Sequence, residues 1–441
     1  MKIRKITARQ IIDSRGIPTI EVTAYSSKSS AKFSVPSGAS VGSFEALELR
    51  DNNLQEYFGK SVYKAVNHVN NQINKILVGK NPLYQKDIDS ILIDYDNTDN
   101  KSHLGANAIL GTSIAVAKLV AQEENIPVFK YVRALFNPYV NFDLKSEYKM
   151  PIPMFNMING GAHADNDVAA QEFMIIPAKP RTMQTRIKAA AEINNAIKEI
   201  LKSDKENSSL GDEGGYAAFV KSRKANLYTD SESILDLLQS ATIKAGYEPG
   251  NEIFYGMDVA VTRYYKAQSN ENNNDVSGIY TIPNWTKKGD FKNDFSQLLE
   301  TYKHLTQKYP ILSIEDGAAE NDWPSWVKLK KALSENVYIV GDDLTVTNQK
   351  RLQKAILLNC VNALIIKPNQ IGTLSEVFET CAKAYENKID IIVSHRSGET
   401  TDDFIADLAV GLNSKFYKGG NIMRGERVVK YNRLLEIEEL I

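Results

Sequence analysis

The sequence of 441 residues has few cysteines, no excess charge of either sign and no hydrophobic run long enough for a membrane span. Its two cysteines, Cys360 and Cys381, lie in segments with the pattern of amphipathic helices, away from metal-ligand spacing, so we expect reduced thiols inside a cytoplasmic protein. The 53 basic and 54 acidic residues balance, which argues against nucleic acid or an anionic membrane as the main partner. A small charged ligand fits better, and charges within Met1–Ile6 argue against a signal peptide.

The first third of the chain has the pattern of a mixed α+β domain. Alternating residues at 19–25 and 32–35 predict an antiparallel meander. Apolar residues at helical spacing between Val62 and Leu77 predict one helix, and a second apolar helix covers about 106–121. The stretch from Phe136 to Lys149 has no clear period, so we place a boundary there and predict domains at 1–138 and 145–441.

From Pro151 onward, short apolar runs alternate with amphipathic helices, which is typical of a βα-repeat fold. Two strand-like runs precede the first long helix, so the repeat is not a regular eightfold one. The Asn-rich stretch 269–275 is predicted to be a solvated loop. The predicted strands are 153–158, 173–176, 253–258, 311–315, 337–340, 363–366 and 391–394, and the predicted helices include 183–201, 295–309, 349–358 and 374–385.

Acidic residues stand repeatedly where these predicted strands end, namely Asp258, Glu315 and Asp342. Any one of them could simply cap the helix that follows. In a parallel barrel, however, the carboxyl ends of the strands converge on one rim. Three carboxylates there would form an oxygen-only site suited to Mg²⁺.

Lys367 follows the apolar run 363–366, where a lysine is unusual unless its head reaches water. Desolvation and nearby metal cations would both lower its pKa and make a neutral base available. His163 and His395 lie in loops at strand ends, although each could be a hydrogen-bonded structural histidine. Arg396 with Ser397 could hold a phosphate through a guanidinium fork and a hydroxyl, but the arginine could equally lie on the surface.

Two glycine-bearing loops complete the candidate site. The loop 36–42 could present backbone N–H groups and hydroxyls to a phosphate or a metal, although most such loops are merely turns. The run Gly211–Gly215 is more informative, because acids between glycines suggest a carboxylate that a tightly shaped backbone presents to a site.

Taken together, these motifs are specific in order and spacing, and the chain resembles the enolase family along nearly its whole length. The motifs that carry the resemblance are Asp13–Gly16, Ser37–Ser40, Gly105–Ile109, Asn159–Ala164, Gln171–Ile175, Gly211–Gly215, Ser313–Asp316, Gly341–Leu344, Asn369–Gly372 and Ser394–Thr400.

The resemblance implies an α+β N-terminal cap domain and a modified TIM barrel of the type ββαα(βα)6, whose second strand runs antiparallel. It implies reversible, magnesium-dependent dehydration of 2-phosphoglycerate to phosphoenolpyruvate, with two Mg²⁺ per active site. In the family pattern Asp258, Glu315 and Asp342 bind the first Mg²⁺, and Ser40 helps to hold the second.

By the same resemblance, Lys367 is the base that takes the C2 proton and Glu213 is the acid that protonates the departing hydroxyl. The remaining roles fall to residues that support the acid or line the substrate site. These are Glu172, His163, His395, Gln171, Ala39, the phosphate clamp Arg396 and Ser397, and Lys418, which complements the oxyanion.

The sequence also departs from the family pattern. The departures are Ile17, Val41, Ala218, Arg263, Gly425 and Glu436. Because the family has an arginine where Glu436 stands, and pairs it across a dimer interface with the acid matching Glu21, two acids would face each other in the expected homodimer or higher homo-oligomer. The alternatives are therefore a paralogue acting on a phosphonate analogue, which Val41 slightly favours, and a catalytically silent scaffold or binding protein.

Overall fold

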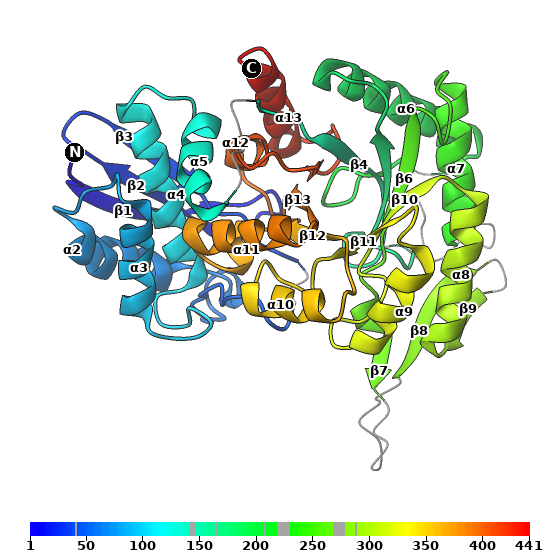
Figure 1. The fold of residues 1–441 in the computed structure, drawn as a ribbon, viewed down its shortest axis with the longest axis horizontal. Coiled ribbons are helices and arrows are strands. Elements are labelled where there is room, and N and C mark those ends of the chain that lie inside the picture. The colour runs from blue at the N-terminus through cyan, green and yellow to red at the C-terminus, as the bar shows by residue number, and fades with distance from the viewer. Residues whose placement is uncertain are drawn as a thin grey trace.

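The computed structural model describes residues 1–39, 42–141, 147–164, 166, 168–206, 208–217, 230–267, 278–286 and 289–441. A small N-terminal domain lies beside a larger barrel, and the chain ends on a helix that packs outside the barrel (Figure 1). Among the helices that the structure describes, none combines the length and the apolar character needed to cross a membrane.

The cap domain begins with a three-stranded antiparallel sheet formed by β1 (Lys5–Ile12), β2 (Pro18–Tyr25) and β3 (Ser30–Ser34). Strands β2 and β3 confirm the predicted meander. Strand β1 is absent from the predicted elements, because its apolar residues Ile6, Ala8, Ile11 and Ile12 do not keep a period of two.

Helices cover this sheet. The helix predicted between Val62 and Leu77 is interrupted by a π-helical turn, so that α1, η2 and α2 follow one another. The long helix α4 packs on β2 and β3, and a Cβ on Gly111 would lie only 2.5 Å from the Val22 side chain, so this close approach requires glycine. The elements are η1 (Tyr57–Gly59), α1 (Tyr63–Asn67), η2 (His68–Ile73), α2 (Asn74–Leu77), α3 (Gln85–Asp96), α4 (Ala106–Glu123), α5 (Val128–Phe136) and η3 (Asn137–Tyr139).

The second domain is a closed barrel with the strand order β10-β11-β12-β13-β14-β4-β5-β6. Strand β5 pairs antiparallel with both of its neighbours, β4 and β6, whereas the other neighbouring strands pair parallel. The predicted fold class, with its reversed second strand, is therefore confirmed. The strands are β4 (Ile152–Asn159), β5 (Glu172–Pro177), β6 (Ile253–Asp258), β10 (Ile311–Glu315), β11 (Tyr338–Gly341), β12 (Ala363–Ile366), β13 (Asp390–Ser394) and β14 (Phe416–Lys418).

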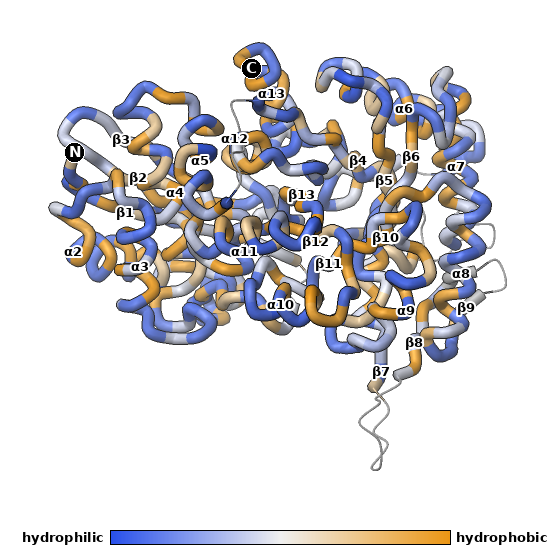
Figure 2. The backbone as a smooth tube through the Cα atoms, in the orientation of Figure 1, coloured by the Kyte–Doolittle hydropathy of each residue, from blue (hydrophilic) through white to orange (hydrophobic). Residues whose placement is uncertain are grey.

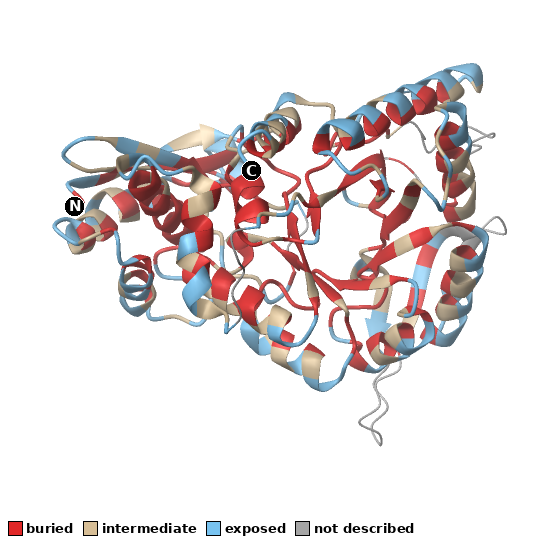
Figure 3. Cartoon of the chain, turned by 45° about the horizontal axis from the view of Figure 1, so that its top comes forward, coloured by how far each residue is buried: buried red, intermediate tan, exposed pale blue. Residues whose placement is uncertain are grey.

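The barrel strands are almost wholly buried, because helices cover their outer faces (Figure 3). Hydrophobic residues accordingly concentrate in the strands and on the inner sides of the helices (Figure 2). The surrounding helices are α6 (Met183–Ser203), α7 (Ser231–Lys244), α8 (Phe295–Lys308), α9 (Trp323–Leu333), α10 (Gln349–Leu357), α11 (Leu374–Glu386), α12 (Phe404–Gly411) and α13 (Gly425–Glu438).

Shorter elements lie between these. A small antiparallel sheet outside the barrel contains β7 (Tyr265–Ala267), β8 (Gly278–Thr286) and β9 (Gly289–Asn293). Single turns are formed by η4 (Val261–Tyr264) and η5 (Pro368–Gln370). The predicted loop at 269–275 lies outside the described residues.

Polar contacts fix the cap domain against the start of α11. The Ser375 backbone N–H and hydroxyl donate to one carboxylate oxygen of Asp89, at 3.0 and 2.7 Å, and the Ser113 hydroxyl accepts the Leu374 N–H at 3.1 Å. Lys101 of the cap domain also pairs with Glu376 at 2.7 Å. Cap-domain side chains thus accept hydrogen bonds from the first backbone N–H groups of α11, which have no partner within the helix.

This junction predicts a specific pH dependence of stability. Burial raises the pKa of Asp89 from 3.8 to about 6. Between these pH values the folded state therefore binds more protons than the unfolded state. The contribution of Asp89 to the free energy of unfolding accordingly falls as pH rises from 4 to 7. Relative to Asp89→Asn, wild-type unfolding free energy should fall by about 3 kcal/mol over this range, as measured by urea denaturation. Asp87→Asn, which changes an exposed residue of the same helix, serves as the control, and parallel profiles for wild type and Asp89→Asn would contradict the assignment.

Candidate active site

Reactive side chains from distant parts of the sequence lie together at one end of the barrel. Asp258 ends β6 and is in register with Glu315, which ends β10. Asp342 and Lys367 immediately follow β11 and β12, and Lys418 ends β14. Because the carboxyl ends of parallel strands meet at one rim, each of these residues is delivered by the end of its own strand.

The reversed strand β5 adds residues to the same rim from its beginning. Glu172 is the first residue of β5 and is in register with Asp258 at the end of β6. Gln171 directly precedes it, and its backbone N–H donates to the Asp258 carbonyl at 2.9 Å. An antiparallel strand thus brings a carboxylate and an amide to a rim that is otherwise built from strand ends.

Lys418 lies at the centre of a buried group of carboxylates. Its Nζ is 2.8 Å from Glu315, 3.1 Å from Glu172 and 3.2 Å from Asp258, and all four side chains are at most 5% exposed. Although burial opposes the charged form, the carboxylates of Glu172, Glu315 and Asp258 raise the pKa of Lys418 well above its usual value. Lys418 is therefore an ammonium ion that offsets much of the repulsion among these acids.

Lys367 forms an ion pair with a carboxylate of the same rim. Burial lowers the pKa of this lysine, as expected, but an ion pair with Asp342 outweighs burial and raises the pKa above its usual value. Without a bound cation, the strand-end carboxylate beside Lys367 therefore stabilises the ammonium form. The neutral amine was predicted for a site that holds metal cations, and it stays a prediction for that state. The Lys367 backbone N–H also donates to Thr347 at 2.9 Å, which fixes the start of the side chain.

Glu213 projects into the rim from a tight glycine turn. Gly214 has a φ of +84°, and the Gly215 N–H donates to the Asn159 side chain at 2.9 Å. One oxygen of Glu213 accepts from Asn156 at 2.9 Å, and ring nitrogens of the two histidines of the rim are 3.3 and 3.6 Å away. The structure therefore places the Glu213 carboxylate of this turn at the rim, beside the two histidines.

Glu172 and Glu213 differ in their expected ionisation. Burial and the neighbouring Glu213 raise the pKa of Glu172 well above its usual value. Burial acts in the same direction on Glu213, but contacts from His163, together with the charge of Arg427, outweigh burial and hold the pKa of Glu213 well below its usual value. Since one donor atom each of His163, Glu172 and Glu213 lie within 4.8 Å of one another, the two carboxyl groups titrate as a coupled pair that readily holds a single proton.

Arg427 sets the tautomer of His395. An arginine can only donate, so its contact with His395 Nδ1 leaves the lone pair on that nitrogen and the proton on Nε2, which faces Glu213. Burial lowers the pKa of His395 well below its usual value, and the Arg427 charge adds to this effect. His395 is thus a neutral ring whose N–H points into the site.

The predicted phosphate clamp joins the two domains. The Ala39 backbone N–H donates to the Ser397 hydroxyl at 2.6 Å, and Arg15 lies 3.4 Å from the same oxygen. Arg396 Nη1 pairs with Glu45 of the cap domain at 2.9 Å. Ser40, the predicted ligand of a second metal, and Val41 lie outside the described residues.

The structure gathers the acidic residues into two sets that could hold a cation. Within the described ranges, groups with one donor atom each inside 4.8 Å of one another are His163, Glu172 and Glu213, and Asp316, Asp342 and Asp343. Of the predicted triad, only Asp342 belongs to such a set, while Asp258 and Glu315 contact Lys418 instead.

Mutual repulsion nevertheless suits this rim to a divalent cation. Burial and the neighbouring Asp258 raise the pKa of Glu315 well above its usual value, and burial with Asp342 raises that of Asp343 to about 8. The second carboxylate oxygen of Glu172 is buried without a hydrogen bond to the residues described. Crowded oxygen ligands of this kind fit Mg²⁺.

A narrow cavity connects these groups. It is lined by most of the predicted site residues, but the volume open to the centre of a water molecule is only about 20 Å³, which is room for little more than one water. The lining residues that the prediction named are His163, Gln171, Glu172, Glu213, Asp258, Asp342, Lys367, His395, Arg396, Ser397 and Lys418.

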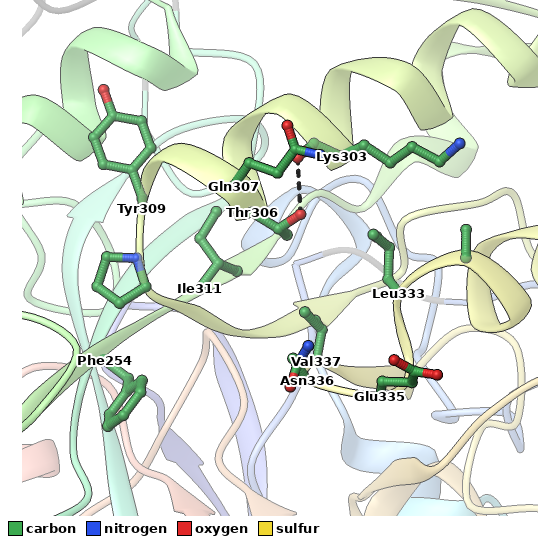
Figure 4. A pocket seen from close by; sticks show the side chains of 12 residues that line it. Phe254, Lys303, Thr306, Gln307, Tyr309, Ile311, Leu333, Glu335, Asn336 and Val337 are labelled. Atoms are coloured by element: carbon green, nitrogen blue, oxygen red, sulfur yellow. Dashed lines mark hydrogen bonds between the residues drawn. The ribbon is translucent and has the colours of Figure 1, made fainter.

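A larger hollow of about 570 Å³ lies at the other end of the barrel (Figure 4). Phe254, Ile311 and Val337, which lie at the beginnings of β6, β10 and β11, contribute apolar side chains to it. Its charged lining residues are Lys303 and Glu335. Among the residues that the structure describes, this hollow has one lysine and one glutamate as charged lining residues, and so no set of converging acids comparable with that at the carboxyl ends.

Several residues of the site were not predicted. Asp316 accepts the N–H groups of Asp342 and Asp343 at 3.0 and 2.9 Å, and it could have been found because it directly follows Glu315. Asn156, Arg427 and Glu45 have no local signal, since their roles depend on partners from distant parts of the chain.

Comparisons with known proteins agree with this architecture. Residues 3–132 match the family model "Enolase, N-terminal domain", and residues 147–441 match "Enolase, C-terminal TIM barrel domain". A curated enolase of Bdellovibrio bacteriovorus is 43% identical over 439 residues, which cover 99% of this chain and 96% of the relative. A curated enolase of Legionella pneumophila (strain Paris) is 45% identical over 441 residues, or 100% of this chain and 97% of the relative.

The position of Lys418 predicts its contribution to stability. In the presence of a metal chelator, Lys418→Met should lower the free energy of unfolding by about 3–5 kcal/mol, because the substitution leaves the buried carboxylates without the lysine ammonium. Lys418→Arg, which keeps the charge, should lose less. Urea denaturation checks this, with the exposed Lys266→Met as the control; a Lys418→Met protein as stable as wild type would contradict the electrostatic role.

Proposed function

The chain belongs to the enolase family, and we propose that the rim residues described above carry out the reversible dehydration of 2-phosphoglycerate to phosphoenolpyruvate. The protein is thus a hydro-lyase. The observation that carries the assignment of the site is that Lys367 and the coupled pair Glu172 and Glu213 line one cavity together with Arg396.

Magnesium dependence is a general property of the family. Asp258, Glu315 and Asp342 would hold a first Mg²⁺ here, and Ser40 would contribute to a second. The raised pKa values of Glu315 and Asp343 support a cation at this rim, because they result from burial together with neighbouring carboxylates. When bound, the metal supplies positive charge that stabilises the additional negative charge on the substrate carboxylate after loss of the C2 proton.

Lys367 is the proposed base for the C2 proton. A proton next to a carboxylate is very weakly acidic, because its removal adds charge to an anion. Lys367 must therefore be a neutral amine at the moment of transfer, and its ion pair with Asp342 has to weaken first. Once that pair weakens, the burial of Lys367 favours the neutral form and with it the base.

Glu213 is the proposed acid for the departing C3 hydroxyl. An ionised Glu213 cannot donate, so the proton of the coupled pair must lie on Glu213 when the hydroxyl leaves. The neutral Nε2–H of His395 and the Asn156 amide can hydrogen-bond its oxygen in either state. Glu172 supports the acid by sharing the proton, and His163 and Gln171 complete the walls around it.

Recognition of the substrate's phosphate is assigned to Arg396 and Ser397, with the Ala39 N–H beside the serine hydroxyl. Lys418 would complement the oxyanion formed at the substrate carboxylate, since its charge is fixed by three acids at the same rim. Both named relatives are enolases, which supports the glycolytic reaction over action on a phosphonate analogue or a silent scaffold role.

We also propose that the chain forms a homodimer or a higher homo-oligomer. The two acids that would face each other each have a partner within the chain. Glu21 pairs with Arg9 and Lys32 at 2.8 and 3.1 Å, and Glu436 pairs with Arg433 at 2.9 Å. These internal pairs support an interface in which the charge of Glu21 is already neutralised.

A cytoplasmic location is proposed on the evidence of the thiols. Cys360 and Cys381 are both free and buried. Buried free cysteines are typical of proteins that fold in a reducing compartment.

The reaction and the two roles can be tested together. With 2-phosphoglycerate and Mg²⁺, the ultraviolet absorbance of the enol product should rise, and excess chelator should abolish the rise. Lys367→Ala and Glu213→Gln should each lower kcat by about 10²–10⁴-fold, the range for a general acid or base. Of the two variants, only Glu213→Gln should still exchange the C2 proton of the substrate with solvent. Nuclear magnetic resonance in deuterium oxide measures this exchange.

Lys303→Ala, in the hollow at the other end of the barrel, is the matched control and should keep full activity. Absence of product from the wild-type protein would overturn the reaction. Proton exchange that survives in Lys367→Ala would overturn the assignment of the base alone.

A further inference from the structure

The buried guanidinium of Arg396 is held by a carboxylate of the other domain. Nη1 of Arg396 is 2.9 Å from one oxygen of Glu45 and Nη2 is 3.3 Å from the other, which is a two-pronged contact between planar groups. The two side chains are only 4% and 5% exposed. An ion pair this buried has a defined geometry that solvent does not average.

Glu45 itself is held in place from both domains. Its carboxylate accepts the Gly42 N–H at 2.9 Å and lies 3.5 Å from the Gln370 amide nitrogen. The next residue, Ala46, donates its N–H to the Gln370 carbonyl at 2.8 Å. Glu45 thus joins the cap loop, the segment after β12 and the phosphate clamp at one point.

The second set of contacts fixes the plane of the guanidinium. Arg396 Nη1 also donates to the Asn369 side chain at 3.0 Å, and the Arg396 backbone N–H donates to Glu399 at 3.1 Å. Asp342 also attracts the Arg396 charge. Without Glu45, this carboxylate would draw the guanidinium toward the predicted metal ligands and away from the phosphate.

We propose that Glu45 is a positioning residue for phosphate recognition, acting through Arg396; this rests on the proposed function. Glu45 has two opposite effects on phosphate binding. Its negative charge would weaken binding by repulsion, whereas its orientation of Arg396 would strengthen binding. Orientation is the larger effect, because the Glu45 charge is already neutralised by the arginine at 2.9 Å. A phosphate held by Arg396 is bound equally in ground and transition states, so loss of orientation should raise KM and spare kcat.

The test compares Glu45→Ala and Glu45→Gln with wild type. Glu45→Ala should raise KM for 2-phosphoglycerate by about tenfold and change kcat by less than about threefold. Glu45→Gln keeps an acceptor oxygen, so its KM should lie between those of wild type and Glu45→Ala. Binding of inorganic phosphate to the full-length protein, measured by calorimetry, should weaken by a similar factor. Glu56→Ala, at an exposed position of the same domain, should change neither quantity.

Unchanged KM and phosphate affinity in folded variants, or tighter phosphate binding, would overturn the proposal. If Glu45→Ala does not fold, Glu45→Gln decides by the same readouts. A wild-type protein without activity whose phosphate affinity still falls in Glu45→Ala would reject the proposed reaction and leave the role of Glu45 standing.

Discussion

The ion cluster around Lys418 is the interaction on which the rest of this site depends. Glu172, Asp258 and Glu315 arrive from three strands and are buried too deeply for water to screen them. One ammonium group from β14 contacts all three. Closure of the barrel, which brings β14 beside β4, therefore has an electrostatic purpose as well as a hydrophobic one, because an open sheet would leave these acids without their cation.

The reversed second strand, with Gln171 and Glu172, came from the resemblance to the enolase family. The periodic pattern of buried strands with acids at their ends predicted a βα-repeat barrel. It did not reveal β14, whose three residues are too short to show a period. It also could not show that Lys367 pairs with Asp342, since the two residues follow different strands and only the closed barrel brings them together. The contact between Glu45 and Arg396 spans 351 positions and has no local signal.

The loops that follow the acidic strands are among the places where the backbone is strained. Ala260 lies two residues after Asp258 and has a φ of +45°, and Asp316 follows Glu315 with a φ of +44°. After β11, the β-branched Val346 and Thr347 have φ values of +42° and +52°, which such residues rarely adopt. Strain of this kind persists only where the surroundings hold it, so the loops that carry the acids are stiff and the carboxylates are oriented before a ligand arrives.

The reversed strand β5 limits how such a barrel can be rearranged. Gln171 and Glu172 reach the rim only because the chain turns back after β4. A barrel built by repeating one identical βα unit eight times would have parallel strands throughout and could not produce this site. A barrel in which β5 ran parallel to β4 and β6 could still close. The beginning of β5, with Gln171 and Glu172, would then lie at the opposite end of the barrel from Asp258.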